Sequence, residues 1–200
     1  MYSFISGNNF IIFNLNWLPN TEYDSIYNNK RTTTMTFRID KSIMDKLRVE
    51  ANNRGISLNM LVNQIIKNFV DWYMFEPKIG MIPLSKPVVI ELFRNLKEEE
   101  VLHIATGIGK NAIYDIALFM KTRIDMDLFL EWFESRMKNS SMHISHIVNG
   151  HTHTYTMKHD ICLNWSLYYK TILDLIFYEI FKKRVDINIS EGSFTITFEK

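Results

Sequence analysis

Hydrophobic and polar residues alternate along residues 32–40, which read TTTMTFRID. Successive side chains of an extended chain point to opposite sides. The polar side therefore holds Thr34, Thr36 and Arg38, and the apolar side holds Met35, Phe37 and Ile39. The pattern predicts a strand that buries one side in a core, while its other side offers hydroxyls and a guanidinium that can hydrogen-bond to base edges and phosphates.

Two amphipathic helices are predicted directly after this strand. Asp40 is suited to cap the first helix, in which apolar residues recur at helical spacing as far as Gly55. Ser57 is suited to cap the second helix, whose apolar residues repeat at i, i+3 and i+4 up to Val70. The segment is therefore expected to fold as strand, helix, helix.

The predicted strand needs a partner, because its backbone groups have no neighbouring strand within this segment. A module of roughly 45 residues is also near the lower limit for independent folding. We expect a second copy of the chain to supply the partner strand. The two strands would form an antiparallel ribbon whose apolar side is buried on four helices, and such a ribbon fits the major groove of DNA.

Charge supports this interpretation only once it is divided along the chain. The whole chain has a formal net charge of +1. Between Lys30 and Lys67, eight basic residues stand against three acidic ones, so this stretch carries 8 − 3 = +5. A local excess of positive charge is typical of a nucleic-acid-binding segment.

Proline and glycine in residues 77–87 predict a linker, and the sequence beyond it predicts a second domain. We expect an N-terminal extension over 1–30, a DNA-binding domain over 31–76, the linker over 77–87 and a C-terminal domain over 88–200. The extension shows no clear period, and no function is assigned to it.

The C-terminal domain is expected to be helical first and to end in a ββαββ unit, which makes the fold class α+β. Helices are predicted from 88 to 138, with breaks near Gly107 and Gly109 and near Asp125. Asn149 and Gly150 predict a two-residue hairpin turn. The helix predicted over 164–183 is apolar on most faces, which indicates burial on two sides. Oligomerisation and effector binding are the expected roles of this domain.

Histidines near the predicted hairpin form the strongest candidate for a metal site. With a turn at Asn149 and Gly150, His146, His151 and His153 fall on one face near the hairpin tip. Solvated or locally bonded histidines explain the pattern more simply, so no metal ligand is assigned.

Catalytic chemistry is not predicted. GIGKNA at 107–112 lacks the spacing of a phosphate-binding loop and is interpreted as a turn between helices. Cys162 and His159 have no third group to orient them, so we expect no enzyme activity and no cofactor.

Localisation is expected to be cytoplasmic. A single cysteine fits a reducing compartment, and the apolar stretch FIIFNLNWL is too short to span a bilayer and has no preceding basic residue.

The stretch TMTFRIDKSIMDKLRVEANNRGISLNMLVNQIIKNFV resembles the ribbon-helix-helix repressors of the Arc, MetJ and CopG type. The resemblance covers residues 32–73, and it implies a prokaryotic homodimer that regulates transcription through a two-stranded ribbon in the major groove of operator DNA. Thr34, Thr36 and Arg38 are then the base-reading residues. The expected phosphate-binding residues are Arg31, Lys41, Ser57, Leu58 and Asn59. The start of the second helix fits this role because its unpaired amides attract anions.

Two alternatives remain open at this stage. Ribbon-helix-helix modules also serve as antitoxins, although the folded C-terminal domain is larger than a usual toxin-binding tail. The histidine-rich segment HTHTYTMKHDIC is also similar to the ligand segment of nickel-responsive regulators. In each case double-stranded DNA is the expected partner, together with a second or further copies of the chain, and no membrane contact is expected.

Overall fold

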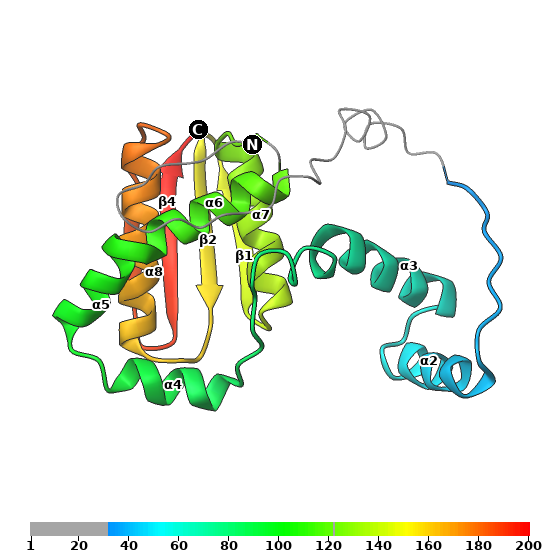
Figure 1. Cartoon of the computed structure of the whole chain (residues 1–200). Coiled ribbons are helices and arrows are strands. Elements are labelled where there is room, and N and C mark those ends of the chain that lie inside the picture. The colour runs from blue at the N-terminus through cyan, green and yellow to red at the C-terminus, as the bar shows by residue number, and fades with distance from the viewer. Residues whose placement is uncertain (1–31, 122) are drawn as a thin grey trace. The chain divides into compact units, whose positions relative to one another are not determined.

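The computed structural model describes residues 32–121 and 123–200. The chain divides into two compact units, Met1–Gly80 and Met81–Lys200, and the division falls inside the predicted linker. The expected extension over 1–30 lies outside the described residues. The two units are drawn in Figure 1 and are described separately below.

The first unit contains the two predicted helices. Helix α2 (Lys41–Asn53) begins where the Asp40 carboxylate accepts a hydrogen bond from the Ser42 amide at 2.8 Å. Helix α3 (Leu58–Asn68) begins where Ser57 Oγ accepts from the Met60 amide at 3.1 Å, and a π-helical turn, η1 (Phe69–Tyr73), extends it. Gly55 takes a φ of +64° in the connection between the helices. Both predicted helices and both predicted caps are confirmed.

The predicted strand over 32–39 is not paired in the single chain. Residues 32–40 form no regular secondary structure and are exposed throughout. The ribbon requires a second copy, so strand pairing stays a prediction.

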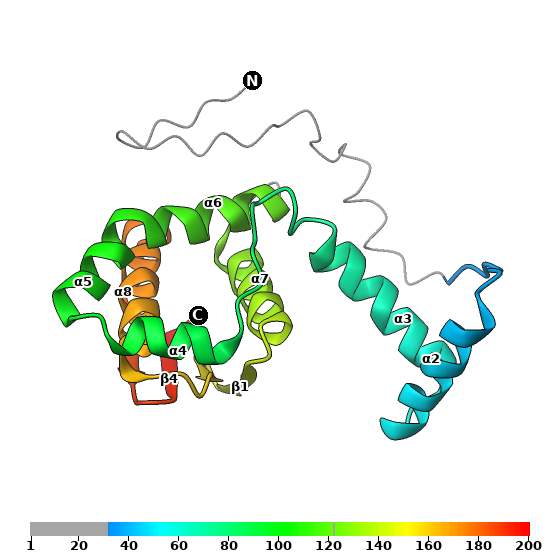
Figure 2. The same cartoon turned by 60° about the horizontal axis from the view of Figure 1, so that its bottom comes forward.

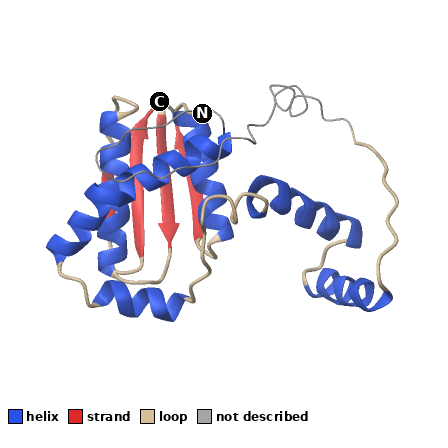
Figure 3. Ribbon diagram, in the orientation of Figure 1, coloured by secondary structure: helices blue, strands red, loops and turns tan. Residues whose placement is uncertain are grey.

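The second unit is an antiparallel sheet with helices against it, which makes the fold α+β as expected. Its strands are β1 (His143–Asn149), β2 (Thr152–Lys158), β3 (Asp186–Ile189) and β4 (Ser193–Glu199), in the spatial order β1-β2-β4-β3. Helix α8 (Leu163–Glu179) connects the two hairpins, so the expected ββαββ order is confirmed. Figure 3 shows the strands side by side with helices crossing in front of them.

Helices of the second unit pack in two tiers. Helix α7 (Met126–Asn139) contacts β1, and α8 contacts β3 and β4. Helices α4 (Lys86–Arg94), α5 (Glu98–Ile104) and α6 (Lys110–Lys121) contact α8 in turn, as the turned view in Figure 2 helps to show. Because α8 lies between the sheet and these helices, its apolar residues are buried on two sides, as its composition predicts.

Aromatic side chains fill the space between the sheet and its helices. Phe129 of α7 lies edge-on to Phe177 of α8, with ring centroids 6.2 Å apart. Tyr169 of α8 stacks on Phe194 of β4 at 5.4 Å. The apolar positions of several elements thus converge in one core.

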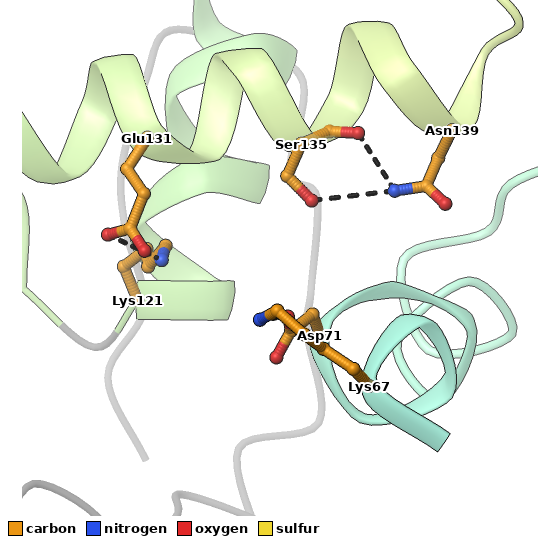
Figure 4. Close-up of polar contacts among 6 residues, drawn as sticks. All are labelled: Lys67, Asp71, Lys121, Glu131, Ser135 and Asn139. Carbon is orange, nitrogen blue, oxygen red and sulfur yellow. Dashed lines mark hydrogen bonds and ion pairs between the residues drawn. The ribbon is translucent and has the colours of Figure 1, made fainter. Parts of the chain in front are cut away.

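Outside the core, Lys121 of α6 forms an ion pair with Glu131 of α7 at 3.1 Å, drawn in Figure 4.

The expected helix break near Gly107 and Gly109 is wrong. The chain runs from α5 through a π-helical turn, η2 (Ala105–Gly109), directly into α6. A Cβ at Gly109 would lie 2.7 Å from Ile172 Cδ1 and 2.9 Å from the Tyr168 hydroxyl. Glycine is therefore needed here for close packing on α8 and does not mark a turn.

The first hairpin also differs from its prediction. Asn149 pairs with Thr152, so the turn residues are Gly150 and His151, not Asn149 and Gly150. Gly150 takes a φ of +63°. As a result His146 lies opposite Tyr155, and His151 leaves the strand.

Candidate nucleic-acid interface

The three predicted base-reading side chains are all accessible. Thr34, Thr36 and Arg38 are exposed in the segment that leads into α2. Arg38 forms no ion pair with any residue that the structure describes. The structure therefore leaves the polar side of this segment free to contact another molecule.

The apolar side of the same segment is exposed as well. Met35 is 68% exposed, Phe37 57% and Ile39 39%. Exposed apolar side chains at alternate positions are unfavourable in water, since burying each would be worth roughly 1.5–3 kcal/mol. A single chain does not cover them within the part of the molecule that the structure describes.

The two helices of the first unit are also incompletely covered. Ala51, Leu61 and Trp72 are its buried apolar residues among those described. Residues of α2, α3 and η1 line an open groove of about 320 Å³. Its walls include the apolar residues Leu47, Leu61, Ile65, Phe69 and Tyr73. Phe69 and Ile65 are 57% and 46% exposed, so the unit presents apolar surface on its helices as well as on residues 32–39.

The start of α3 has the geometry expected of an anion-binding helix end. Ser57 Oγ accepts from the Met60 amide, and the Ser57 carbonyl accepts from Leu61. The amides of Leu58 and Asn59 belong to the first turn, where a helix supplies no acceptor. These two N–H groups are available to a phosphate oxygen. The structure thus places Ser57, Leu58 and Asn59 at the N-terminus of α3, with the Ser57 hydroxyl occupied by the cap.

Three basic side chains further along the first unit are neutralised by ion pairs. Arg48 pairs with Asp45 at 3.3 Å, and Arg54 pairs with Glu50 at 2.6 Å. Lys67 pairs with Asp71 one turn further along, as Figure 4 shows.

By contrast, three cations at the beginning of the unit form no ion pair with described residues: Arg38, Lys41 and Lys46. Lys46 is not among the predicted site residues, and in a helix Glu50 stands at i+4 from it, where the two could pair. In the structure Glu50 pairs with Arg54 instead. Arg31, the remaining predicted phosphate ligand, lies outside the described residues.

Asp40 adds a negative charge beside these cations, but its carboxylate caps helix α2. Hydrogen bonds from the Ser42 side chain and backbone, and from the Ile43 backbone, lower the pKa of its carboxyl group. The Asp40 carboxylate therefore stays ionised at the N-terminus of α2, where the helix dipole favours it.

The histidine hairpin does not form the three-histidine group considered from sequence. His146 Nε2 lies 3.0 Å from His153 Nδ1, and the His146 ring stacks on Tyr155 with centroids 3.9 Å apart. His151 sits in the turn. No group of three His, Cys, Asp or Glu side chains suited to a metal ion occurs in residues 32–121 and 123–200.

Cys162 and His159 are both buried and do not bond to each other. His159 Nδ1 accepts from the Ile161 amide at 3.0 Å, and its Nε2 lies 2.8 Å from Ser166 Oγ. Ser166 Oγ in turn donates to the Ser190 carbonyl at 2.7 Å. Both nitrogens of the imidazole are thereby occupied, and Ser166 joins the start of α8 to the β3–β4 connection.

No protein-family model matches this chain, and no curated protein matches it.

Across the described parts of the chain, no helix combines the length and the apolar character needed to cross a membrane.

Proposed function

We propose that the chain is a transcriptional regulator that binds operator DNA as a homodimer, through a two-stranded ribbon of the ribbon-helix-helix type. The observation that carries this proposal is the exposure of both sides of residues 32–39 in a single chain. Polar and apolar side chains alternate there, and both sides are exposed. A strand paired with its copy would cover the apolar side and present the polar side to DNA.

The surrounding residues supply what such a ribbon needs. The groove and the exposed apolar residues of α2 and α3 provide a surface that a second copy can cover. Arg38, Lys41, Lys46 and the first amides of α3 provide contacts for bases and phosphates. In this proposal Thr34, Thr36 and Arg38 read bases, and the regulator acts on cytoplasmic DNA.

Selection of fragments from the genome that encodes the protein tests this function. The full chain is mixed with sheared genomic DNA, and the retained fragments are sequenced. A matched variant carries Thr34→Ala, Thr36→Ala and Arg38→Ala, which remove the polar side of the ribbon and leave the apolar side intact.

We expect the wild-type protein to enrich fragments that share a palindromic element, because a two-fold dimer reads two related half-sites. The variant should lose this enrichment. Retention of the same fragments by both proteins would show that this strand does not read DNA, and absence of any enriched element with wild type would overturn the proposed function.

A further inference from the structure

Helix α7 carries an arginine whose donors are partly enclosed. Arg136 follows Trp132 and Phe133 by one turn, and both of these aromatic side chains are fully buried. The guanidinium carbon lies 5.7 Å from the centroid of the Trp132 ring. Its Nε and Nη1 atoms are buried, and neither has a hydrogen-bond partner among the described residues. Arg136, which is half-buried overall, therefore carries a positive charge and two unsatisfied donors.

Helix α8 carries a second unsatisfied donor. The Trp165 Nε1 atom is buried and has no hydrogen-bond partner among the residues described. The Trp165 ring stacks beside Tyr168, with centroids 5.7 Å apart and an interplanar angle of 27°. Its edge contact with Phe93 of α4, at 4.6 Å, fixes the ring in place.

Tyr168 and Tyr169 of α8 are the aromatic neighbours of Trp165 on its own helix. Burial, assisted by Tyr169, raises the pKa of the Tyr168 hydroxyl to about 12, and the charge of Arg136 opposes part of this rise. Tyr168 itself stacks beside Trp165, and Tyr169 lies edge-on to Trp165 with ring centroids 5.3 Å apart. Phe133 of α7 contacts Tyr169 of α8 at 6.0 Å, so the two helices face each other here through aromatic rings.

Buried donors without acceptors are rare, because each has given up its bonds to water. Partial burial of a cation without a counter-charge adds a further cost. Both conditions are relieved by one kind of molecule. Its negatively charged oxygens would accept from Arg136 and Trp165, and its apolar body would contact the aromatic rings around them.

We propose that the second unit binds a small carboxylic acid with an aromatic or aliphatic body, held by Arg136 of α7 and by Trp165 and Tyr168 of α8. This site goes beyond the proposed DNA-binding function and does not depend on it, since all of its residues belong to the second unit.

The experiment uses the full chain and three defined acids: octanoate, phenylacetate and indole-3-acetate. Each is compared with its primary amide, which has the same body without the charge. Binding is measured by isothermal titration and by the shift of the thermal unfolding midpoint. The test variant is Arg136→Met, which keeps an apolar side chain of similar length, and the matched control is Arg184→Met at an exposed position.

We expect at least one acid to bind wild type and the Arg184→Met control equally, with its amide binding about tenfold more weakly or worse. Arg136→Met should lose about tenfold or more in affinity for that acid. Trp165→Phe should weaken binding by a smaller factor, because it removes one neutral N–H and retains an aromatic ring. If Arg136→Met does not fold, as judged by circular dichroism, this second variant decides the matter.

Two results would overturn the site. One is that none of the three acids binds wild type below about 1 mM, an affinity too weak for a built site. The other is equal binding of an acid by wild type and by the variants at Arg136 or Trp165, which would locate it on the exposed apolar surface elsewhere. Neither readout involves DNA, so failure here leaves the proposed regulator function standing.

Discussion

Arg38 is the side chain on which the proposed DNA contact depends most. It is exposed, it forms no ion pair with described residues, and it lies on the polar side of residues 32–39. A guanidinium can make two hydrogen bonds to guanine or bind a phosphate. We expect Arg38→Ala to weaken operator binding by about 1–3 kcal/mol while the fold is retained.

Fluorescence anisotropy with a labelled operator measures this loss. Arg48→Ala is the matched control, because Arg48 is an exposed arginine of the same unit that is already paired with Asp45. If Arg38→Ala binds as tightly as the control across a salt titration, Arg38 does not contact DNA.

His159 gives a second prediction at this scale, concerning stability and pH. Burial lowers the pKa of its imidazole from 6.5 to about 4, and the Ile161 amide occupies Nδ1, the atom that would accept the proton. The folded state therefore favours the neutral ring. Protonation favours the unfolded state, so the stabilisation is complete above about pH 6.5 and is lost as the pH falls toward 4. The total loss is about 3 kcal/mol on an order-of-magnitude basis.

Urea denaturation of the full chain at several pH values between about 7.5 and 4 measures this dependence. His159→Gln is the control, because it removes the titrating group and keeps a polar side chain. The variant should be less stable at neutral pH and should lose less stability on acidification. Parallel pH profiles for the two proteins would show that His159 is not the responsible group.

Single residues differ in how far their roles can be predicted from the chain. The caps Asp40 and Ser57 are predictable, because each bonds to an amide within three residues of itself. The unpaired state of Lys46 is not, since Glu50 has two basic neighbours at helical spacing. Arg136 is less predictable still, because its lack of acceptors depends on α7 facing α8, two elements distant in sequence.

At the scale of elements, the hairpin shows where local signals fail. Each residue of β1 pairs with a residue of β2 that lies two positions further along the chain than predicted. A shift of two leaves the same side chains facing the helices in both registers. Apolar alternation therefore cannot choose between them. Pairing of β2 with β4 and burial of Tyr155 in the core involve distant segments, and the Asn-Gly signal carries no information about either.

Residues 32–39 are the element whose pairing is most open to experiment. In the proposed dimer Phe37 is buried where two strands and four helices meet, so Phe37→Asp would place a charge in an apolar core. We expect this variant to lose dimerisation and DNA binding together. Sedimentation of the full chain and operator binding are the two measurements, with Phe37→Leu as the conservative control.

Thr36→Ala should behave differently from Phe37→Asp, although the two residues are adjacent. It alters the polar side only, so the dimer should persist while operator binding weakens. A Phe37→Asp protein that remains dimeric and binds operator would contradict burial of the apolar side.

At the scale of the whole molecule, the α+β class and the ββαββ order follow from hydrophobic periods and turn residues. The strand order β1-β2-β4-β3 does not, because it places β4 between β2 and β3, and only long-range packing determines that insertion. The proposed dimer would likewise be a property of two chains. What supports it in one chain is apolar surface that the described residues leave exposed, on residues 32–39 and along the groove of the first unit.

In the proposed dimer, two-fold symmetry would also set how DNA binding depends on salt. Each phosphate contact releases counterions, so the slope of log K against log salt changes by about 0.9 per contact. Lys41 occurs once per chain at the first turn of α2, and a dimer therefore loses two such contacts in Lys41→Ala. We expect the slope to become shallower by about 2, with affinity falling by a similar factor for operator and unrelated DNA, because phosphates carry no sequence information. Lys158→Ala, at an exposed position of β2, is the control and should leave the slope unchanged. A change of about 1 would indicate that only one protomer contacts DNA, and no change would remove Lys41 from the interface.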